Sequence, residues 1–174
     1  MVHETPFPHP GAAGAPDATM QCVDEPVDVA ARIGAITNAV RRRDAQTMIE
    51  LMSRVSGQPA RLAGPSIIGV GHYHYRYPTG REGDGPAAAF SPRSTATVVY
   101  LPDGVGAHRD NLEKLGPHTS GVGCLYLKDL SKVDISVLES IIRDSYATLT
   151  AGTFGHRARE WSDRRPGGER SSEG

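Results

Sequence analysis

The sequence predicts one α+β domain, an antiparallel β-sheet with helices packed on one face. Three observations lead to this fold class. Apolar residues recur at helical spacing towards both ends of the central region, runs of β-branched and aromatic residues lie between them, and short Gly, Pro and Asp turns join the runs. Strands joined by short turns pair in antiparallel fashion. A length of 174 residues, 38% hydrophobic residues and a formal net charge of −1 suit a single small domain.

Both ends of the chain have the composition of flexible tails. Residues 1–24 are rich in Pro, Ala and Gly, and residues 151–174 are rich in Arg, Gly, Ser and Glu. Neither end offers enough apolar surface to join a core. We therefore expect a disordered tail over 1–24, the folded domain over 25–150 and a flexible tail over 151–174.

Two helices open the expected domain. Residues 27–36 form the first, and the second ends at Gly57. Their apolar stripes are Val29, Ile33 and Ile36 in the first helix and Met48, Leu51, Met52 and Val55 in the second. The three arginines at 41–43 suggest a nucleic-acid patch or, as we prefer, a solvated helix face. The near-neutral charge of the chain argues against a nucleic-acid partner.

The stretch from 64 to 93 holds the highest density of ligand-type side chains, and residues 66–77 within it predict one strand. Side chains alternate between the two faces of a strand. One face is aromatic and the other basic, with Ile67, Tyr73, Tyr75 and Tyr77 on the first and Ile68, Val70, His72, His74 and Arg76 on the second. Gly69 and Gly71 on the aromatic side suggest a bulge or a close approach. Residues 87–90 return as a second strand, so that Arg81, Glu82 and Asp84 lie in the hairpin loop.

The remaining elements follow from the same rules. Residues 95–101 are rich in β-branched side chains and predict a third strand, residues 107–115 a short helix, and residues 124–127 a fourth strand. Asp134 is expected to cap a last helix. Its core-facing stripe is Ile135, Leu138, Ile141, Ile142 and Leu149.

Cysteine usage and hydropathy indicate the compartment. Cys22 and Cys124 make no disulfide framework, which favours free thiols in a reducing, cytoplasmic setting. The first residues lack the basic start and continuous apolar core of a secretory signal. No segment reaches transmembrane length, so we expect no membrane partner.

Four motifs resemble those of one known family. MIELMSRVSG, GPSIIGVGHYHYRYPTGREGD, FSPR and GVGCLYLKDLSKVDISVLESII occur in this order between about residues 41 and 145. They are similar to motifs of the YdhG-like family, a bacterial domain of unknown function in which some members are labelled iron chaperone or frataxin-like. The resemblance implies an α+β fold. The chain departs from the family at Ala63 and Gly85, where Trp is usual, and at Val122, where Lys is usual.

Arginines in these motifs suggest an anion site. Guanidinium groups bind carboxylate or phosphate through paired hydrogen bonds. The expected ligand-binding set is Tyr73, His74, Tyr75, Arg81, Glu82, Asp84, Ser91, Arg93 and Lys128. In the alternative interpretation Arg81 and Arg93 pair internally with Glu82 or Asp84 and hold the loop.

A metal site is a second possibility. His72 and His74 share a strand face, and Glu82, Asp84 or His118 would complete the shell around iron or zinc. The alternative is that both histidines are hydrogen-bonded structural residues.

These observations favour a binding or chaperone-type module with a small polar pocket near the hairpin, lined by His74, Tyr75, Arg81 and Arg93. The ligand is a small anion or a metal. An enzyme acting on a small anionic substrate and a protein-interaction module using the sheet are the alternatives. Nucleophilic catalysis has little support, because the apolar neighbours of Cys124 favour a buried, unreactive thiol.

Overall fold

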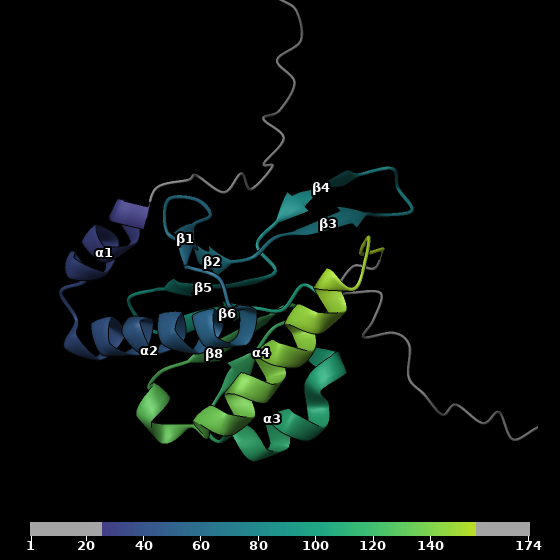
Figure 1. Cartoon of the computed structure of the whole chain (residues 1–174). Helices are drawn as coiled ribbons and strands as arrows, with labels where there is room; N and C mark the ends of the chain where they lie inside the picture. Colours follow the sequence, from purple (N-terminus) through teal and green to yellow (C-terminus); the bar gives the residue numbers. More distant parts are fainter. Residues whose placement is uncertain (1–25, 156–174) are drawn as a thin grey trace, which may run out of the picture.

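The structure, a computed structural model, describes residues 26–155 and shows an α+β fold (Figure 1). The tail expected over 1–24 and the segment 156–174 lie outside the described residues. The helices are α1 (Pro26–Gly34), α2 (Ala39–Ser56), α3 (Arg109–Leu115) and α4 (Ile135–Thr150), with 3-10 turns η1 (Val105–His108) and η2 (Leu130–Lys132). The strands are β1 (Arg61–Leu62), β2 (Ile68–Val70), β3 (Tyr73–Arg76), β4 (Glu82–Gly85), β5 (Ala88–Pro92), β6 (Thr97–Tyr100), β7 (Thr119–Ser120) and β8 (Cys124–Leu127).

The main sheet has six strands in the order β1-β2-β5-β6-β8-β7, and every neighbouring pair is antiparallel. Strands β3 and β4 form a separate two-stranded ribbon, which projects from the β2–β5 end of the sheet (Figure 1). Helices α2 and α4 lie side by side across one face of the sheet. The fold class predicted from the sequence is therefore confirmed.

The core lies between this helical layer and the sheet. Its largest fully buried side chains are Met48, Leu51 and Met52 of α2, Leu138, Ile141 and Ile142 of α4, and Ile68, Phe90, Leu101, Leu115, Leu125 and Leu127 from the sheet and α3. Each such side chain contributes about 1.5–3 kcal/mol by leaving water. The buried side chains of α2 and α4 belong to the apolar stripes that the helical periodicity predicts.

Local capping explains where the long helices begin and end. The side chain of Asn38 accepts a hydrogen bond from the Arg41 backbone N–H at 3.1 Å, and the predicted cap Asp134 accepts one from the Ser136 N–H at 2.9 Å. Gly57 ends α2 at a φ of 68°, a left-handed conformation that glycine adopts without strain.

The central stretch differs from the prediction. The strand expected over 66–77 is two strands, because Gly71 turns the chain with a φ of 60°. A Cβ at Gly71 would lie 2.8 Å from the Tyr146 hydroxyl, so α4 leaves no room for a side chain at this turn. The hairpin loop expected to hold Glu82 and Asp84 was also wrong, since both lie on strand β4, which pairs with β3. Strand β5 pairs with β2 instead.

The folded body extends past residue 150, where the sequence suggested a flexible tail. Phe154 is buried, its N–H donates to the His74 carbonyl at 2.8 Å, and the Arg76 N–H donates to the Phe154 carbonyl at 2.9 Å. Residues 153–155 thus lie against β3. The average composition of residues 151–174 does not reveal that Phe154 packs on the folded body.

Within the described chain, no helix is both long and apolar enough to cross a membrane.

Candidate functional site

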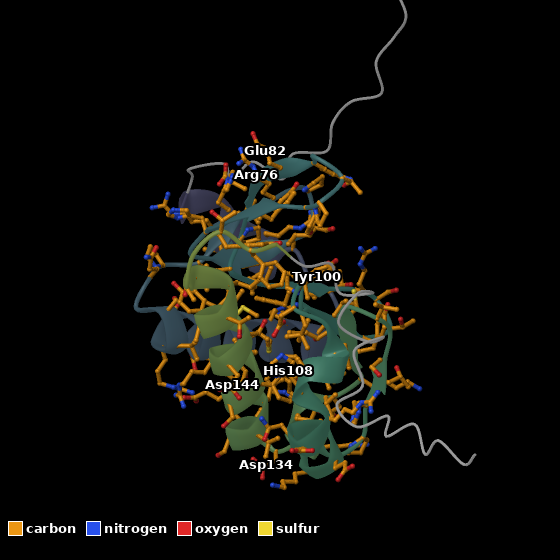
Figure 2. All side chains as sticks on the ribbon, turned by 90° about the vertical axis from the view of Figure 1, so that its right-hand side faces the viewer. Arg76, Glu82, Tyr100, His108, Asp134 and Asp144 are labelled. Carbon is orange, nitrogen blue, oxygen red and sulfur yellow. The ribbon has the colours of Figure 1, made fainter. Side chains whose placement is uncertain are left out.

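The solvent face of the ribbon carries two cross-strand pairs. The Nδ1 atom of His74 lies 3.1 Å from Asp84. Arg76 contacts Glu82 at 2.6 Å (Figure 2). All four side chains are exposed, and exposed ion pairs add little stability. The carboxylates expected to pair with Arg81 or Arg93 therefore have other partners.

The opposite face of the ribbon is aromatic, as the alternation predicts for this part of the strand. Tyr73 is buried, with its ring centroid 5.9 Å from that of Tyr75 and 6.1 Å from that of Phe154. Tyr75 stacks on Tyr77 at 4.9 Å. Burial raises the pKa of the Tyr73 phenol, so this hydroxyl stays protonated. These contacts give Tyr73 and Tyr75 a packing role.

The predicted anion-binding residues beyond these ribbon contacts lie on different elements. Arg81 lies at the tip of the ribbon, before β4, whereas Arg93 follows β5. Ser91 is fully buried and donates to the Ser66 carbonyl at 2.8 Å. Lys128 is exposed beyond β8. The cleft that Arg93 lines does not include His74, Tyr75 or Arg81, the three residues expected to share a polar pocket with it.

The histidine pair does not gain a full set of ligands within residues 26–155. His72 is exposed between β2 and β3, and His74 has Asp84 beside it. His118 contacts the Gly116 carbonyl in its own turn at 2.8 Å. Residues 26–155 contain no group of three or more His, Cys, Asp or Glu side chains placed to hold a metal ion.

A different set of arginines does converge. Arg32 of α1, Arg41 of α2 and Arg93 of the β5–β6 turn line a cleft of about 510 Å³. Its other lining residues are Ala35, Ile36, Thr37, Asn38, Pro92 and Ser94. We call this the arginine cleft, and no Asp or Glu is among the described residues that line it. The helical hairpin places two of these arginines, and the β5–β6 turn places the third.

Arg41 departs from the solvated face expected for residues 41–43, whereas Arg42 and Arg43 are exposed as expected. It is 5% exposed and donates to the Thr97 hydroxyl at 2.9 Å and the Leu127 carbonyl at 3.2 Å. The fully buried Asp44 lies 3.4 Å from it. Removing Asp44 would leave the Arg41 charge buried without its carboxylate, whereas Asp44 also contacts Arg43 at 2.8 Å. The hydrogen bonds from Arg41 to Thr97 and Leu127 hold α2 on the sheet.

Sequence reasoning missed a second buried polar cluster. The Asp103 carboxylate accepts from the Ser145 hydroxyl at 2.6 Å and lies 2.8 Å from Nε2 of His108. All three residues are buried. In a Ser-His-Asp triad the histidine lies between the other two. Here the aspartate does, so His108 is not placed to activate Ser145. In the sequence Asp103 looks like an ordinary turn residue, which explains the omission.

Cys124 is a half-buried free thiol. Burial raises the pKa of the thiol and keeps it protonated at neutral pH, as expected for an unreactive cysteine. Cys22 lies outside the described residues.

Comparison with known proteins yields no match among family models, curated proteins or solved structures. The resemblance to the YdhG-like family therefore stays a prediction.

Proposed function

We propose that this protein is a small-molecule binding module that holds an anionic ligand in the arginine cleft. The observation that carries the proposal is the convergence of Arg32, Arg41 and Arg93 from three separate elements on one cleft, in which residues 26–155 place no carboxylate. In a chain with a formal net charge of −1, this concentration of positive charge is local rather than general. The proposal keeps the anionic ligand that the sequence predicts. It also keeps Arg93, one of the residues predicted to bind that ligand.

The three arginines have different parts in the proposed site. The guanidinium of Arg41 already has protein partners and forms a fixed, partly balanced charge at the base. Arg32 and Arg93 are exposed, and the contact of Arg93 with the Tyr100 hydroxyl is long, at 3.5 Å. Two accessible guanidinium groups suit a carboxylate or phosphate, which each can bind through two parallel hydrogen bonds.

The α2 terminus adds to the same potential. Asn38 caps this helix of 18 residues and also lines the cleft, and its first turn contains no acidic residue. The partial positive charge of the helix end favours an anion by roughly 0.3–1 kcal/mol.

The test is a thermal-shift screen of the full chain with phosphate, citrate and other small anions. A ligand at about 100 times its Kd should stabilise the wild type by about 2.7 kcal/mol. Arg32→Lys and Arg93→Lys should fold normally and lose most of this stabilisation, because an ammonium group cannot reproduce the bidentate contact. Arg81→Lys, at the ribbon tip, is the matched control and should respond like the wild type.

Two results would contradict the proposal. In one, no anion of the panel stabilises the wild type. In the other, the Arg81→Lys variant loses as much stabilisation as the Arg93→Lys variant, which would make the effect a general response to charge.

A further inference from the structure

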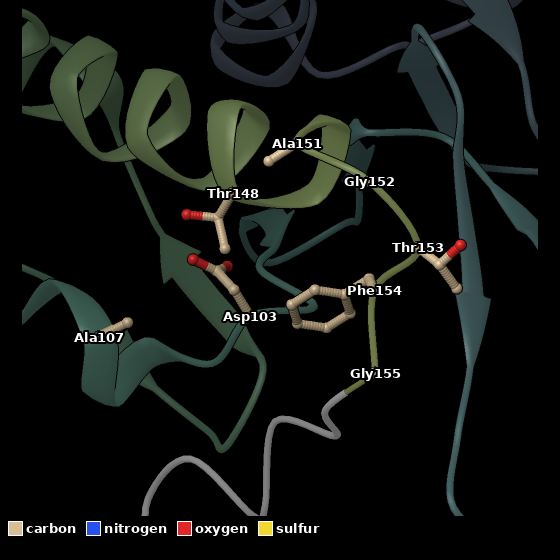
Figure 3. A pocket seen from close by; sticks show the side chains of 8 residues that line it. All are labelled: Asp103, Ala107, Thr148, Ala151, Gly152, Thr153, Phe154 and Gly155. Carbon is tan, nitrogen blue, oxygen red and sulfur yellow. The ribbon is translucent and has the colours of Figure 1, made fainter.

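A second cavity lies on the other side of the domain, and it shares no lining residue with the arginine cleft. It has a volume of about 340 Å³. Figure 3 shows it between the C-terminal end of α4, the 151–155 segment and the loop that carries Asp103. Its lining residues are Asp103, Ala107, Thr148, Ala151, Gly152, Thr153, Phe154 and Gly155. Asp103 is the one charged residue among these eight.

The Asp103 carboxylate has unused acceptor capacity. It is 4% exposed, and its two oxygens contact Ser145 and His108. An ionised carboxylate offers about four acceptor positions. These two contacts hold the carboxylate in place at the cavity wall.

Two other features favour positive charge in the same space. Helix α4 has 16 residues and ends at Thr150, with Ala151 as its C-cap, and no basic side chain lies in its last turn to balance the negative end of its dipole. The ring of Phe154 forms part of the wall (Figure 3). The face of an aromatic ring attracts a cation.

We infer that this cavity binds a small organic ammonium ion. The ammonium group donates to Asp103, and the carbon stem packs against Ala107, Ala151 and Phe154. The volume lies at the lower end of the range of ligand sites, which suits an amine with a short alkyl or aryl substituent. Neither the sequence motifs nor the proposed anion site requires this cavity. A negative result for the ammonium site therefore leaves the anion site untested, and the reverse also holds.

The test uses ¹⁵N-labelled full-length protein at pH 7, where alkylamines are protonated in the same way as a lysine side chain. The probes are n-butylamine and 2-phenylethylamine, and n-butanol and 2-phenylethanol are their neutral counterparts. Each amine should shift the amide signals of Ala107, Gly152 and Gly155 and bind at least tenfold more tightly than its alcohol.

Three variants separate the site from a general effect. Asp103→Asn should weaken amine binding at least tenfold and bring it close to alcohol binding. If that variant fails to fold, Thr148→Phe provides the same information, because Thr148 is exposed on α4 and a ring there fills the cavity while Asp103 remains. Ala147→Phe is the matched control, since Ala147 is exposed on the same helix but does not line the cavity.

Equal affinities for amine and alcohol would overturn the inference, and so would amine binding that Thr148→Phe leaves unchanged. Shifts confined to the amide signals of Glu82 and Asp84, whose exposed carboxylates lie on the ribbon, would also overturn it.

Discussion

Removing residues 153–155 should destabilise the protein, although the composition of this end suggests that it is dispensable. Two truncated chains make the comparison, one ending at Gly152 and the other at Gly155. Both lack residues 156–174, so their difference reports on 153–155 alone. The structure places the Phe154 side chain in a cluster with Tyr73, Ala87 and Leu149.

The expected magnitude follows from three contributions. Burying an aromatic side chain removes about 150–200 Å² from water, which stabilises by about 4–5 kcal/mol as an upper value. Ordering three residues costs about 1–2 kcal/mol each. The two backbone hydrogen bonds between Phe154 and β3 add about 0.5–1.5 kcal/mol each. The net contribution is about 2 kcal/mol.

The assay is thermal unfolding followed by circular dichroism. A loss of about 2 kcal/mol corresponds to a fall of roughly 5–10 °C for a domain of this size. Phe154→Ala in the full chain should produce much of the same fall, since it removes the buried ring and leaves the backbone intact. Midpoints of the two truncated chains within about 1 °C of each other would refute the argument that this segment is part of the folded body.

Two further predictions concern buried and exposed charge. Asp44→Ala should cost about 3–5 kcal/mol in urea unfolding, because it leaves the Arg41 guanidinium buried and uncompensated, whereas Glu50→Ala on the exposed side of α2 should be nearly neutral. Hydrogen bonds from Ser131 hold the pKa of Asp129 at about 2, below its ordinary value of 3.8, so its stabilisation is present above about pH 4 and is lost as the pH falls towards 2. The stability difference between wild type and Asp129→Asn should therefore shrink over that interval, and a difference constant from pH 7 to pH 2 would contradict this assignment.

Much of the fold follows from patterns that are local in the sequence. The three-and-four spacing of Met48, Leu51 and Met52 predicts the buried face of α2, because a helix returns these residues to one side. Asp134 predicts the start of α4, since its short side chain satisfies the free N–H groups there. The β-branched run before Leu101 predicts β6. Each signal involves residues within about two helical turns of one another.

The candidate sites depend on contacts between segments far apart in the sequence. Tyr146 leaves no room for a side chain at Gly71, and the buried Asp103 is hydrogen-bonded to Ser145. The arginine cleft needs Arg32 and Arg93 brought together from α1 and the β5–β6 turn. Local patterns determine which way a side chain faces on its own element, whereas packing of the elements decides which charges meet. The sequence by itself therefore determined the helices, several strands and the fold class, and the tertiary structure alone decided which polar side chains share a cavity.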